Sequence, residues 1–245
     1  MPVLDKGQIL FSNNFRITDN ISVRHSTVGD IINLGEEKYF GILSTLTSIP
    51  SDAKSVLDDM GIDWVEISDL EFFALIAGGL SESESGIFLP NIDLRKFKLY
   101  KRPDGDIVYA DKDNSIIIDK RAHMMILETL CTIHKIKKKP EKPGSKLARQ
   151  WLIEEDREKR MLAARKKEKN GFESTLIPLI SSAVNSSGFK YDYQTVLTLP
   201  YGQFMDAVAR LQIIKSADAL LSGCYSGNVD MKKLNKKNLD WMREI

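Results

Sequence analysis

The chain has 245 residues and a mass of 27.7 kDa, which allows one large domain or two small ones with a hydrophobic core. Its composition, 42% hydrophobic and 28% charged, excludes collagen-like and wholly disordered proteins. Cys131 and Cys224 are too few for a disulfide scaffold and form no Cys-x-x-Cys pair, which favours a reducing compartment. Residues 1–6 lack a signal-peptide pattern and no window approaches 18 apolar residues. We therefore expect a soluble protein that is not exported and has no membrane partner.

The net charge of +1 hides a strong asymmetry along the chain. Residues 1–134 carry a net charge of −8, residues 135–169 a net charge of +8, and residues 170–245 a net charge of +1. Shifts of this size predict three physically different pieces. We expect an acidic α+β domain at 1–134, a basic linker with an exposed helix at 135–170, and a helical domain at 171–245.

The first part of the acidic domain combines weak strand signals with clearer helix signals. Residues 8–11 and 15–17 read as two short strands separated by Asn13 and Asn14, which suit a turn. Capping patterns and helical spacing then predict three helices. They run from Thr27 to Pro50, from Asp52 to Met60 with Gly61 as the end signal, and from Ser68 onward.

The second part of the acidic domain predicts a β-hairpin followed by a helix. The segments Phe97–Lys101 and Asp106–Ala110 alternate in polarity, and Pro103, Asp104 and Gly105 between them are turn-forming residues. Residues 115–118 read as a third strand. Asp119 is placed to cap a helix that continues to about His134.

From Lys135 the chain becomes polar and basic. Two prolines and a glycine within residues 135–144 predict an exposed linker, and Ser145 is placed to cap the next helix. That helix contains a wholly charged stretch, 154–160, so we expect its surface to be solvated. Its predicted i,i+4 ion pairs are Glu155 with Lys159 and Asp156 with Arg160, and Gly171 is the predicted end.

The last third of the chain is mostly helical. One helix is expected over 172–184, then a loop, and a longer helix that begins at Pro200 and ends at Gly223. The longer helix carries a broad apolar stripe. Its members include Phe204, Val208, Leu211, Ile213, Ile214, Leu220 and Leu221.

Signatures of catalysis are absent from the sequence. There is no Gly-Lys dipeptide for a P-loop, no G-x-G-x-x-G after a strand and no G-x-S-x-G elbow. His123 and His134 lack zinc-type spacing, and we interpret His134 as solvated and His123 as a surface or interface residue. Residues 111–114 lack the glycine and terminal glutamate of a calcium loop, so they indicate a turn. We expect a protein that is not an enzyme and holds no metal or cofactor. A weaker alternative is an enzyme whose active site is assembled from carboxylates that lie far apart in the sequence.

The basic segment has two interpretations. Its 14 lysines and arginines within 35 residues could bind nucleic acid phosphates. They could instead solubilise a linker or pair with the acidic first domain, and the interleaved aromatics typical of single-strand binding are missing. We favour structural or protein-binding roles. The phosphate contacts under the first interpretation would be Lys137, Lys138, Lys139, Lys142 and Arg149.

Two features of the sequence suggest contact with a protein partner. The apolar stripe of the last long helix is either domain core or a docking face. Trp241, near the end of the sequence, is either folded back onto the core or held out for a partner. The predicted partner contacts are Trp151, Phe204, Val208, Leu211 and Trp241.

Three blocks of sequence together resemble proteins from the tail-gene clusters of bacteriophages and prophages of Gram-positive bacteria. The first block is 25–32 with 34–40, the second is 57–63 with 68–73, and the third is the set formed by 199–204, 210–212, 220–223 and 239–243. The resemblance covers most of the chain. It implies a role in tail morphogenesis, either as an assembly chaperone for a tape-measure or tail-tube protein or as a minor structural subunit. It also implies a location in the bacterial host cytoplasm, with the virion as an alternative.

Overall fold

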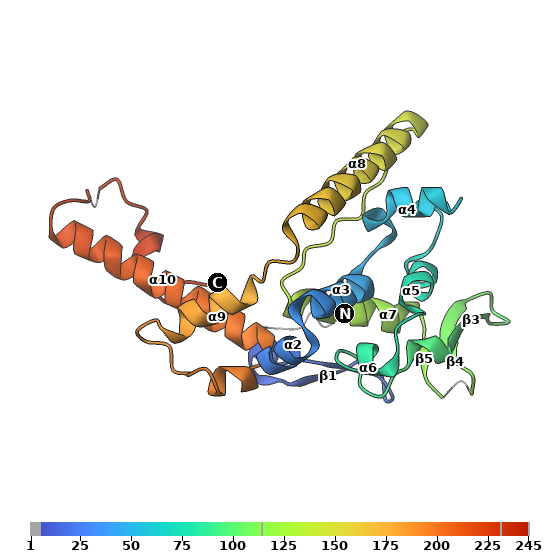
Figure 1. The fold of residues 1–245 in the computed structure, drawn as a ribbon, viewed down its shortest axis with the longest axis horizontal. Coiled ribbons are helices and arrows are strands. Elements are labelled where there is room, and N and C mark those ends of the chain that lie inside the picture. The colour runs from blue at the N-terminus through green and yellow to red at the C-terminus, as the bar shows by residue number, and fades with distance from the viewer. Residues whose placement is uncertain (1–5, 114, 231, 245) are drawn as a thin grey trace. The chain divides into compact units, whose positions relative to one another are not determined.

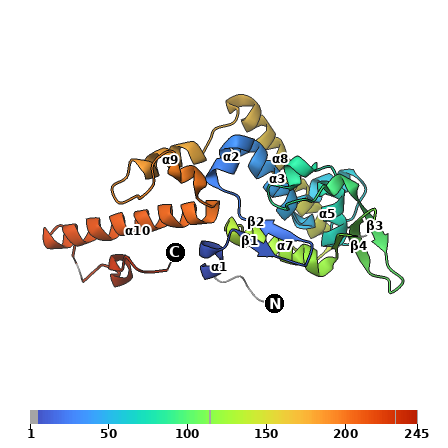
Figure 2. The same ribbon diagram turned by 90° about the horizontal axis from the view of Figure 1, so that it is seen from below.

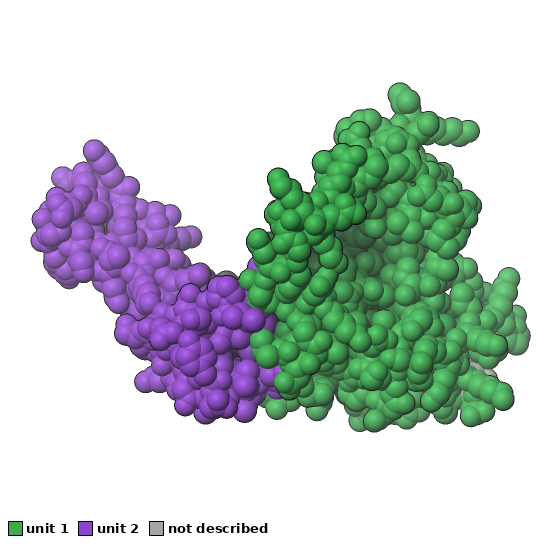
Figure 3. Space-filling view, viewed as in Figure 1, with its two compact units in different colours: residues 1–26, 30–174 green, residues 27–29, 175–245 purple. Residues whose placement is uncertain are grey.

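The computed structural model describes residues 6–113, 115–230 and 232–244 and is α+β, as predicted. The chain divides into two compact units (Figure 3). Unit 1 comprises residues 1–26 and 30–174, and unit 2 comprises residues 27–29 and 175–245. Within the described residues, no helix is long and apolar enough to cross a membrane. Residues 1–5, on which part of the export prediction rests, lie outside this description.

Unit 1 contains most of the helices and both small sheets (Figure 1). Its elements include α1 (Lys6–Phe11), β1 (Asn14–Arg16), β2 (Ser22–Arg24), α2 (Val28–Leu34, whose first residues belong to unit 2), α3 (Glu36–Thr47), η1 (Pro50–Asp52), α4 (Lys54–Asp59), α5 (Asp69–Ala77), α6 (Glu82–Ser85), η2 (Leu94–Lys96), β3 (Phe97–Lys101), β4 (Ile107–Asp111), β5 (Ile117–Ile118), α7 (Lys120–Ile133) and α8 (Lys146–Asn170).

The first predicted strand is wrong, because residues 8–11 belong to helix α1. The hairpin forms instead between β1 and β2, which follow α1 in the chain. The two strands pair antiparallel with Phe15 opposite Val23, and both of these side chains are buried. A run of consecutive apolar residues such as 9–11 fits a helix as well as a strand, so its periodicity could not decide. α7 packs beside β2 (Figure 2).

The single helix predicted from Thr27 to Pro50 is two helices, α2 and α3. Gly35 between them has φ 91°, a left-handed conformation that cannot continue a right-handed helix. The next helix is also shorter than predicted, since Pro50–Asp52 forms the 3-10 turn η1 and α4 begins at Lys54. The predicted end signal is confirmed, because Gly61 has φ 71° directly after α4.

The remaining local predictions for unit 1 are largely confirmed. Ser68 and Glu71 form the capping box of α5, with the Glu71 amide donating to the Ser68 Oγ at 3.3 Å. β3 and β4 pair antiparallel around a turn in which Gly105 has φ 94°. The third strand is reduced to β5, and Asp119 caps α7 by accepting from the Ala122 amide at 2.7 Å.

Both histidine predictions are wrong, because His123 is buried and not at the surface, and His134 is half-buried with both ring nitrogens bonded and not solvated. His123 packs on Phe73 with ring centroids 4.7 Å apart, and burial lowers its pKa to about 4. The Nδ1 of His134 donates to the Leu130 carbonyl at 2.9 Å, so its Nε2 accepts from the Tyr39 hydroxyl at 2.8 Å. Burial also lowers the pKa of His134 to about 4. Both imidazoles are therefore neutral in the folded chain at pH 7.

Unit 2 is built on one long helix, as predicted. Its elements include α9 (Leu176–Val184), η3 (Thr195–Thr198), α10 (Tyr201–Tyr225) and η4 (Lys236–Leu239). The helix predicted to end at Gly223 continues two residues further. A Cβ at Gly223 would lie 2.7 Å from the Val229 Cγ2, so this glycine permits a close approach of the following loop and does not end the helix.

Candidate functional site

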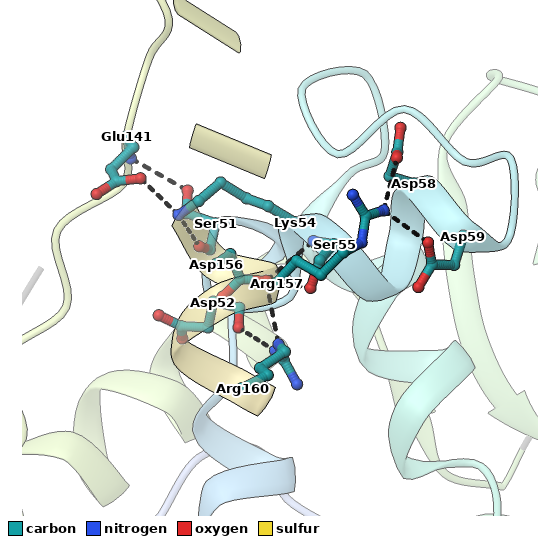
Figure 4. Close-up of polar contacts among 10 residues, drawn as sticks. All are labelled: Ser51, Asp52, Lys54, Ser55, Asp58, Asp59, Glu141, Asp156, Arg157 and Arg160. Atoms are coloured by element: carbon teal, nitrogen blue, oxygen red, sulfur yellow. Dashed lines mark hydrogen bonds and ion pairs between the residues drawn. The ribbon is translucent and has the colours of Figure 1, made fainter. Parts of the chain in front are cut away.

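The basic segment 135–170 lies along the acidic helix α4 of the same unit. Residues 135–174 belong to unit 1, together with the acidic part of the chain. Helix α8 begins as predicted, with the Ser145 Oγ accepting from the Ala148 amide at 3.1 Å. α4 and α8 then pack against each other (Figure 4).

The irregular part of the segment is tied down before α8 begins. The Lys138 ammonium pairs with the Asp52 carboxylate at 2.5 Å. In a second ion pair, the segment supplies the carboxylate: Glu141 lies 2.6 Å from the Lys54 ammonium. The Glu141 amide also donates to the Ser51 Oγ at 3.1 Å. Residues 138–141 thus run along η1 and the first turn of α4.

Asp156 of α8 supplies the N-terminal cap that α4 lacks. The N-cap residue of α4, Ala53, has no side-chain acceptor. Instead, the Asp156 Oδ2 accepts from the Ser55 amide at 2.9 Å and from the Ser55 hydroxyl at 2.6 Å. Burial alone would raise the pKa of Asp156, but the hydrogen bonds from Ser55 and from the Arg160 guanidinium outweigh it and lower that pKa. The carboxylate thus remains charged and stabilises the positive end of α4.

Arginines of α8 complete the contact. The Arg157 guanidinium lies 2.7 Å from the Asp59 carboxylate and 3.2 Å from that of Asp58, and hydrogen bonds to these groups and to Glu154 raise its pKa. The Arg160 Nη2 donates to the Asp52 carbonyl at 2.6 Å. The predicted helical pairs are confirmed, with Glu155 2.6 Å from Lys159 and Asp156 3.0 Å from Arg160.

An apolar cluster lies beneath these polar contacts. Ile153 of α8 is 6% exposed and packs with Leu57, Trp64 and Phe72 in one buried cluster. The Lys54 ammonium lies 5.6 Å from the centre of the Trp64 ring, a cation–π distance. We call this whole arrangement the α4–α8 clamp. It consists of Ser51, Asp52, Lys54, Ser55, Asp58, Asp59, Glu141, Asp156, Arg157 and Arg160 around Ile153.

The opposite side of α8 is exposed and partly apolar. Leu147 is 80% exposed and Trp151 is 64% exposed, and their spacing of four residues places them on one face of the helix. Leu162 follows three turns after Trp151 on the same side and is also largely exposed. We call Leu147, Trp151 and Leu162 the α8 outer face. Leu147 and Trp151 are neighbours on this face, whereas Leu162 lies three turns further along it.

The predicted phosphate contacts fall into two groups: some form ion pairs within unit 1, and the others are exposed. Lys138 is held in the clamp, and Arg149 pairs with Asp63 at 2.6 Å. Lys137, Lys139 and Lys142 are exposed, and within the described residues no ion pair is recorded for them. The structure therefore supports the interpretation in which the basic segment pairs with the acidic domain of its own chain.

The predicted partner contacts in unit 2 lie partly in its core. Phe204 and Val208 are buried, with Phe204 6.4 Å from the Phe189 ring in an edge-on arrangement, and Leu211 is half-buried. The Arg210 guanidinium donates to the carbonyls of Trp241 at 2.7 Å and Arg243 at 2.9 Å, so this segment folds back onto α10. The Trp241 side chain remains 53% exposed.

Among the described residues, no group of three or more His, Cys, Asp or Glu side chains is placed to hold a metal ion. Asp111 instead stabilises a turn, since its carboxylate accepts from the Ile116 amide at 3.0 Å. Asn114, which was part of the calcium-loop comparison, lies outside the described residues.

The functional role that sequence reasoning missed is the capping of α4 by Asp156. Its pairing with Arg160 was visible from the i,i+4 spacing, but its partner Ser55 lies 101 residues away in the chain. A missing cap at Ala53 was the only local sign that α4 needs an acceptor from elsewhere.

One comparison with known proteins finds a match. The model of the family described as YomV second domain matches residues 165–245, which cover the end of α8 and most of unit 2. No curated protein and no solved structure matches the chain. The C-terminal third of this chain is therefore similar to a domain family associated with phages and prophages.

Proposed function

We propose that this chain is a non-enzymatic phage or prophage protein that acts in tail morphogenesis through protein–protein contacts. Its most direct role would be an assembly chaperone for a tail component of tape-measure or tail-tube type. The family match at residues 165–245 supports the phage association. The tail role follows from the resemblance of the three sequence blocks.

The observation that carries the proposal is the α8 outer face. The clamp fixes one side of α8 on unit 1, so Leu147, Trp151 and Leu162 are held on the other side. A fixed helix with a large aromatic on its exposed face resembles the anchors of helix-mediated recognition. Such a surface can cover the apolar helices of a partner before that partner assembles.

The same geometry makes part of the basic segment less available to nucleic acid, although Lys137, Lys139 and Lys142 are exposed. The clamp and the Arg149–Asp63 pair use Lys138, Arg149, Arg157 and Arg160 within the chain. Counterion release requires cations that are available to phosphates, and stacking requires several aromatic platforms. The basic segment contains one aromatic residue, Trp151.

A capture experiment with an identified readout tests the proposal. The full chain would be used as bait in phage-infected or prophage-induced cells, in parallel captures with and without nuclease. Bound proteins would be identified by mass spectrometry, and bound nucleic acid would be quantified in the capture without nuclease. A second bait would carry Leu147→Lys and Trp151→Lys. The matched control, Tyr225→Lys, changes an aromatic that is 88% exposed at the end of α10. Purified virions would be probed for the bait in parallel.

We expect the full chain and the control to recover a tail protein, and the double variant to lose it. Absence of the bait from virions would indicate a chaperone, whereas its presence would indicate the minor structural subunit. Recovery of nucleic acid alone, or loss of every partner on nuclease treatment, would overturn the proposal in favour of nucleic acid binding.

A further inference from the structure

Residues 161–170, at the end of α8, follow the last residue of the clamp, and all of them are exposed. The side of α8 that faces unit 1 is marked by Ile153 and Arg160 in the clamp. It is marked further along by Lys167, which pairs with Glu37 of α3 at 2.5 Å. At about 100° of rotation per residue, Ile153, Arg160 and Lys167 lie within about 40° of one another. The opposite side of the helix is therefore turned away from unit 1.

This opposite side carries a regular pattern of charged residues. Glu154 and Glu158 are four residues apart, and Arg165 and Lys169 follow them at the same spacing. At the same rotation per residue, the four lie within about 60° of one another, so they form one line along the helix. We call these four residues the α8 stripe. Its first half is acidic and its second half is basic.

Two apolar side chains lie at the centre of the α8 stripe. Met161 is 49% exposed and Leu162 is 64% exposed. The helix dipole accounts for basic residues in the last turn of α8, but it does not account for glutamates that lie more than two turns from the start of the helix. Solubility of an exposed helix does not require large apolar side chains between the charges. Charges that flank an apolar centre are instead typical of a surface that pairs with another helix.

The charges of the α8 stripe are available to such a partner. Within the described residues, Glu158, Arg165 and Lys169 form no ion pair and no side-chain hydrogen bond. The Glu154 Oε1 accepts from the Arg157 guanidinium at 2.6 Å, which leaves the Glu154 Oε2 for a second donor. Contacts within the chain therefore use only a small part of the stripe.

The α8 stripe is complementary to a second copy of itself. In an antiparallel pair of α8 helices with a two-fold axis through the centre of the stripe, residues at equal distances on either side of that centre face each other. Glu158 then faces Arg165 of the second copy, and Glu154 faces Lys169 of the second copy, because both pairs have the same midpoint in the sequence. The two-fold axis repeats both ion pairs. Flanking charges of this kind set the choice and orientation of paired helices.

Other occupants fit the stripe less well. In a parallel pair of helices in register, Glu158 would face Glu158 and Arg165 would face Arg165. Like charges at these positions destabilise a helix pair. Nucleic acid phosphates would be repelled by the acidic half of the stripe. A second copy in the antiparallel orientation is complementary to both halves.

We propose that two copies of this chain associate through antiparallel α8 helices, with Met161 and Leu162 at the centre of the contact and the α8 stripe at its flank. Residues 154–169 form about four turns from each copy, which is a small interface. We therefore expect a Kd on the order of 10 µM, so that the chain is mostly a monomer at lower concentrations. Leu147 and Trp151 lie outside the contact, and each dimer presents both of them twice. The dimer goes beyond the proposed function and does not depend on it.

Sedimentation equilibrium with the full chain, from about 1 µM to about 300 µM, tests the dimer. The charge variants are Glu158→Lys, Arg165→Glu and the two changes combined in one chain. The apolar variant is Leu162→Lys. Its matched control is Ala163→Lys, at the next exposed residue of α8, which lies about 150° around the helix from the stripe. Glu128→Lys, at an exposed residue of α7, is the control for charge reversal.

We expect each single charge variant to raise the Kd of the dimer about tenfold, because the two-fold axis turns one reversal into two like-charge contacts. The combined variant should return the Kd to within about threefold of the unmodified chain. Leu162→Lys should also raise the Kd about tenfold, whereas both control variants should leave it unchanged.

Three results would overturn the proposal. The first is a chain that stays monomeric over the whole concentration range. The second is a dimer that Leu162→Lys or the single charge variants leave intact. The third is a combined variant that does not recover, since a parallel pair would place residue 158 against residue 158 and would gain nothing from the exchange of charges.

The double variant Leu147→Lys with Trp151→Lys separates the dimer from the proposed function. It should dimerise as tightly as the unmodified chain does, because both changes lie outside residues 154–169. Dimer formation can therefore fail while the capture of a tail protein succeeds, and the reverse can also occur.

Discussion

Helices α8 and α10 have the same length, 25 residues each, but are attached to their units by different forces. Among the described residues of α8, Ile153 is the buried one, and ion pairs and the Asp156 cap hold much of its remaining contact with α4. α10 buries Gly202, Phe204, Val208 and Ala217. The attachment of a helix held by charged groups depends on pH and salt concentration. The attachment of a helix held by apolar burial is weakened mainly by substitutions that shorten its buried side chains.

The two attachments also suit different roles. Apolar burial fixes α10 as the core of unit 2, which leaves few of its large side chains for a partner. Attachment of α8 by one polar face leaves Leu147 and Trp151 exposed on the other. The comparison therefore favours α8 over α10 as the partner-binding helix, although sequence patterning pointed to both.

Acid should distinguish the two units most strongly. All three histidines of the chain lie in unit 1. His123 has a pKa of about 4 in the folded chain against 6.5 ordinarily, so the unfolded chain binds protons more readily. The free energy of unfolding should therefore be highest above pH 6.5 and should fall as the pH drops towards 4. The loss due to His123 is on the order of 3 kcal/mol. Hydrogen exchange at several pH values should show unit 1 opening in this range while α10 stays protected.

The control for this effect is His123→Leu. Within the described residues, the His123 Nε2 is buried without a hydrogen-bond partner, so an apolar replacement removes an unsatisfied group. The variant should remove the part of the stability loss between pH 6.5 and pH 4 that is due to His123, while His134, whose pKa is also lowered to about 4, should still contribute. An unchanged acid profile in this variant would contradict the assigned cause.

Removal of the largest buried side chain of α10 should make unit 2 less stable than unit 1, so that unit 2 opens first. Phe204→Ala leaves a cavity where a fully buried ring contacts Phe189, with an expected cost of about 3–5 kcal/mol. Denaturation followed by hydrogen exchange should show early opening of unit 2 and an unchanged α8. Tyr225→Ala, at a side chain that is 88% exposed, should have no measurable effect on either helix.

Loss of the cap supplied by Asp156 should loosen α8 to a smaller degree. Asp156→Ala leaves the Ser55 amide and hydroxyl and the Arg160 guanidinium without their shared acceptor. Loss of an N-cap costs about 1–2 kcal/mol. Limited proteolysis should then cut earlier within residues 135–160. Glu158→Ala, on the exposed side of the same helix, is the control and should leave the cutting pattern unchanged.

Local parts of the fold could be predicted because their causes lie within a few residues. The caps at Ser68, Asp119 and Ser145 and the turn at Gly105 follow from side-chain acceptors and from a positive φ. The ion pairs Glu155–Lys159 and Asp156–Arg160 follow from helical spacing.

Long-range contacts could not be predicted from local pattern. His134 stands beside a lysine run, yet it is held by Tyr39, which is 95 residues away. The clamp joins Ser55 to Asp156 across 101 residues. For the candidate site, charge counting suggested that the basic segment pairs with the acidic domain, but it could not indicate which side of α8 would remain exposed.

Salt should produce the smallest difference between the two helices. Raising NaCl from about 0.1 M to about 1 M shortens the screening length from about 10 Å to about 3 Å. The ion pairs of Arg157 with Asp58 and Asp59 are exposed to solvent, and exposed ion pairs contribute little to stability and are screened by salt. Ile153 should keep the helix docked, so we expect faster hydrogen exchange at the start of α8 and no dissociation. Hydrogen exchange in α10 should have the same rate in both solutions. An equal effect of salt on the two helices would show that ion pairs do not stabilise the contact between α4 and α8.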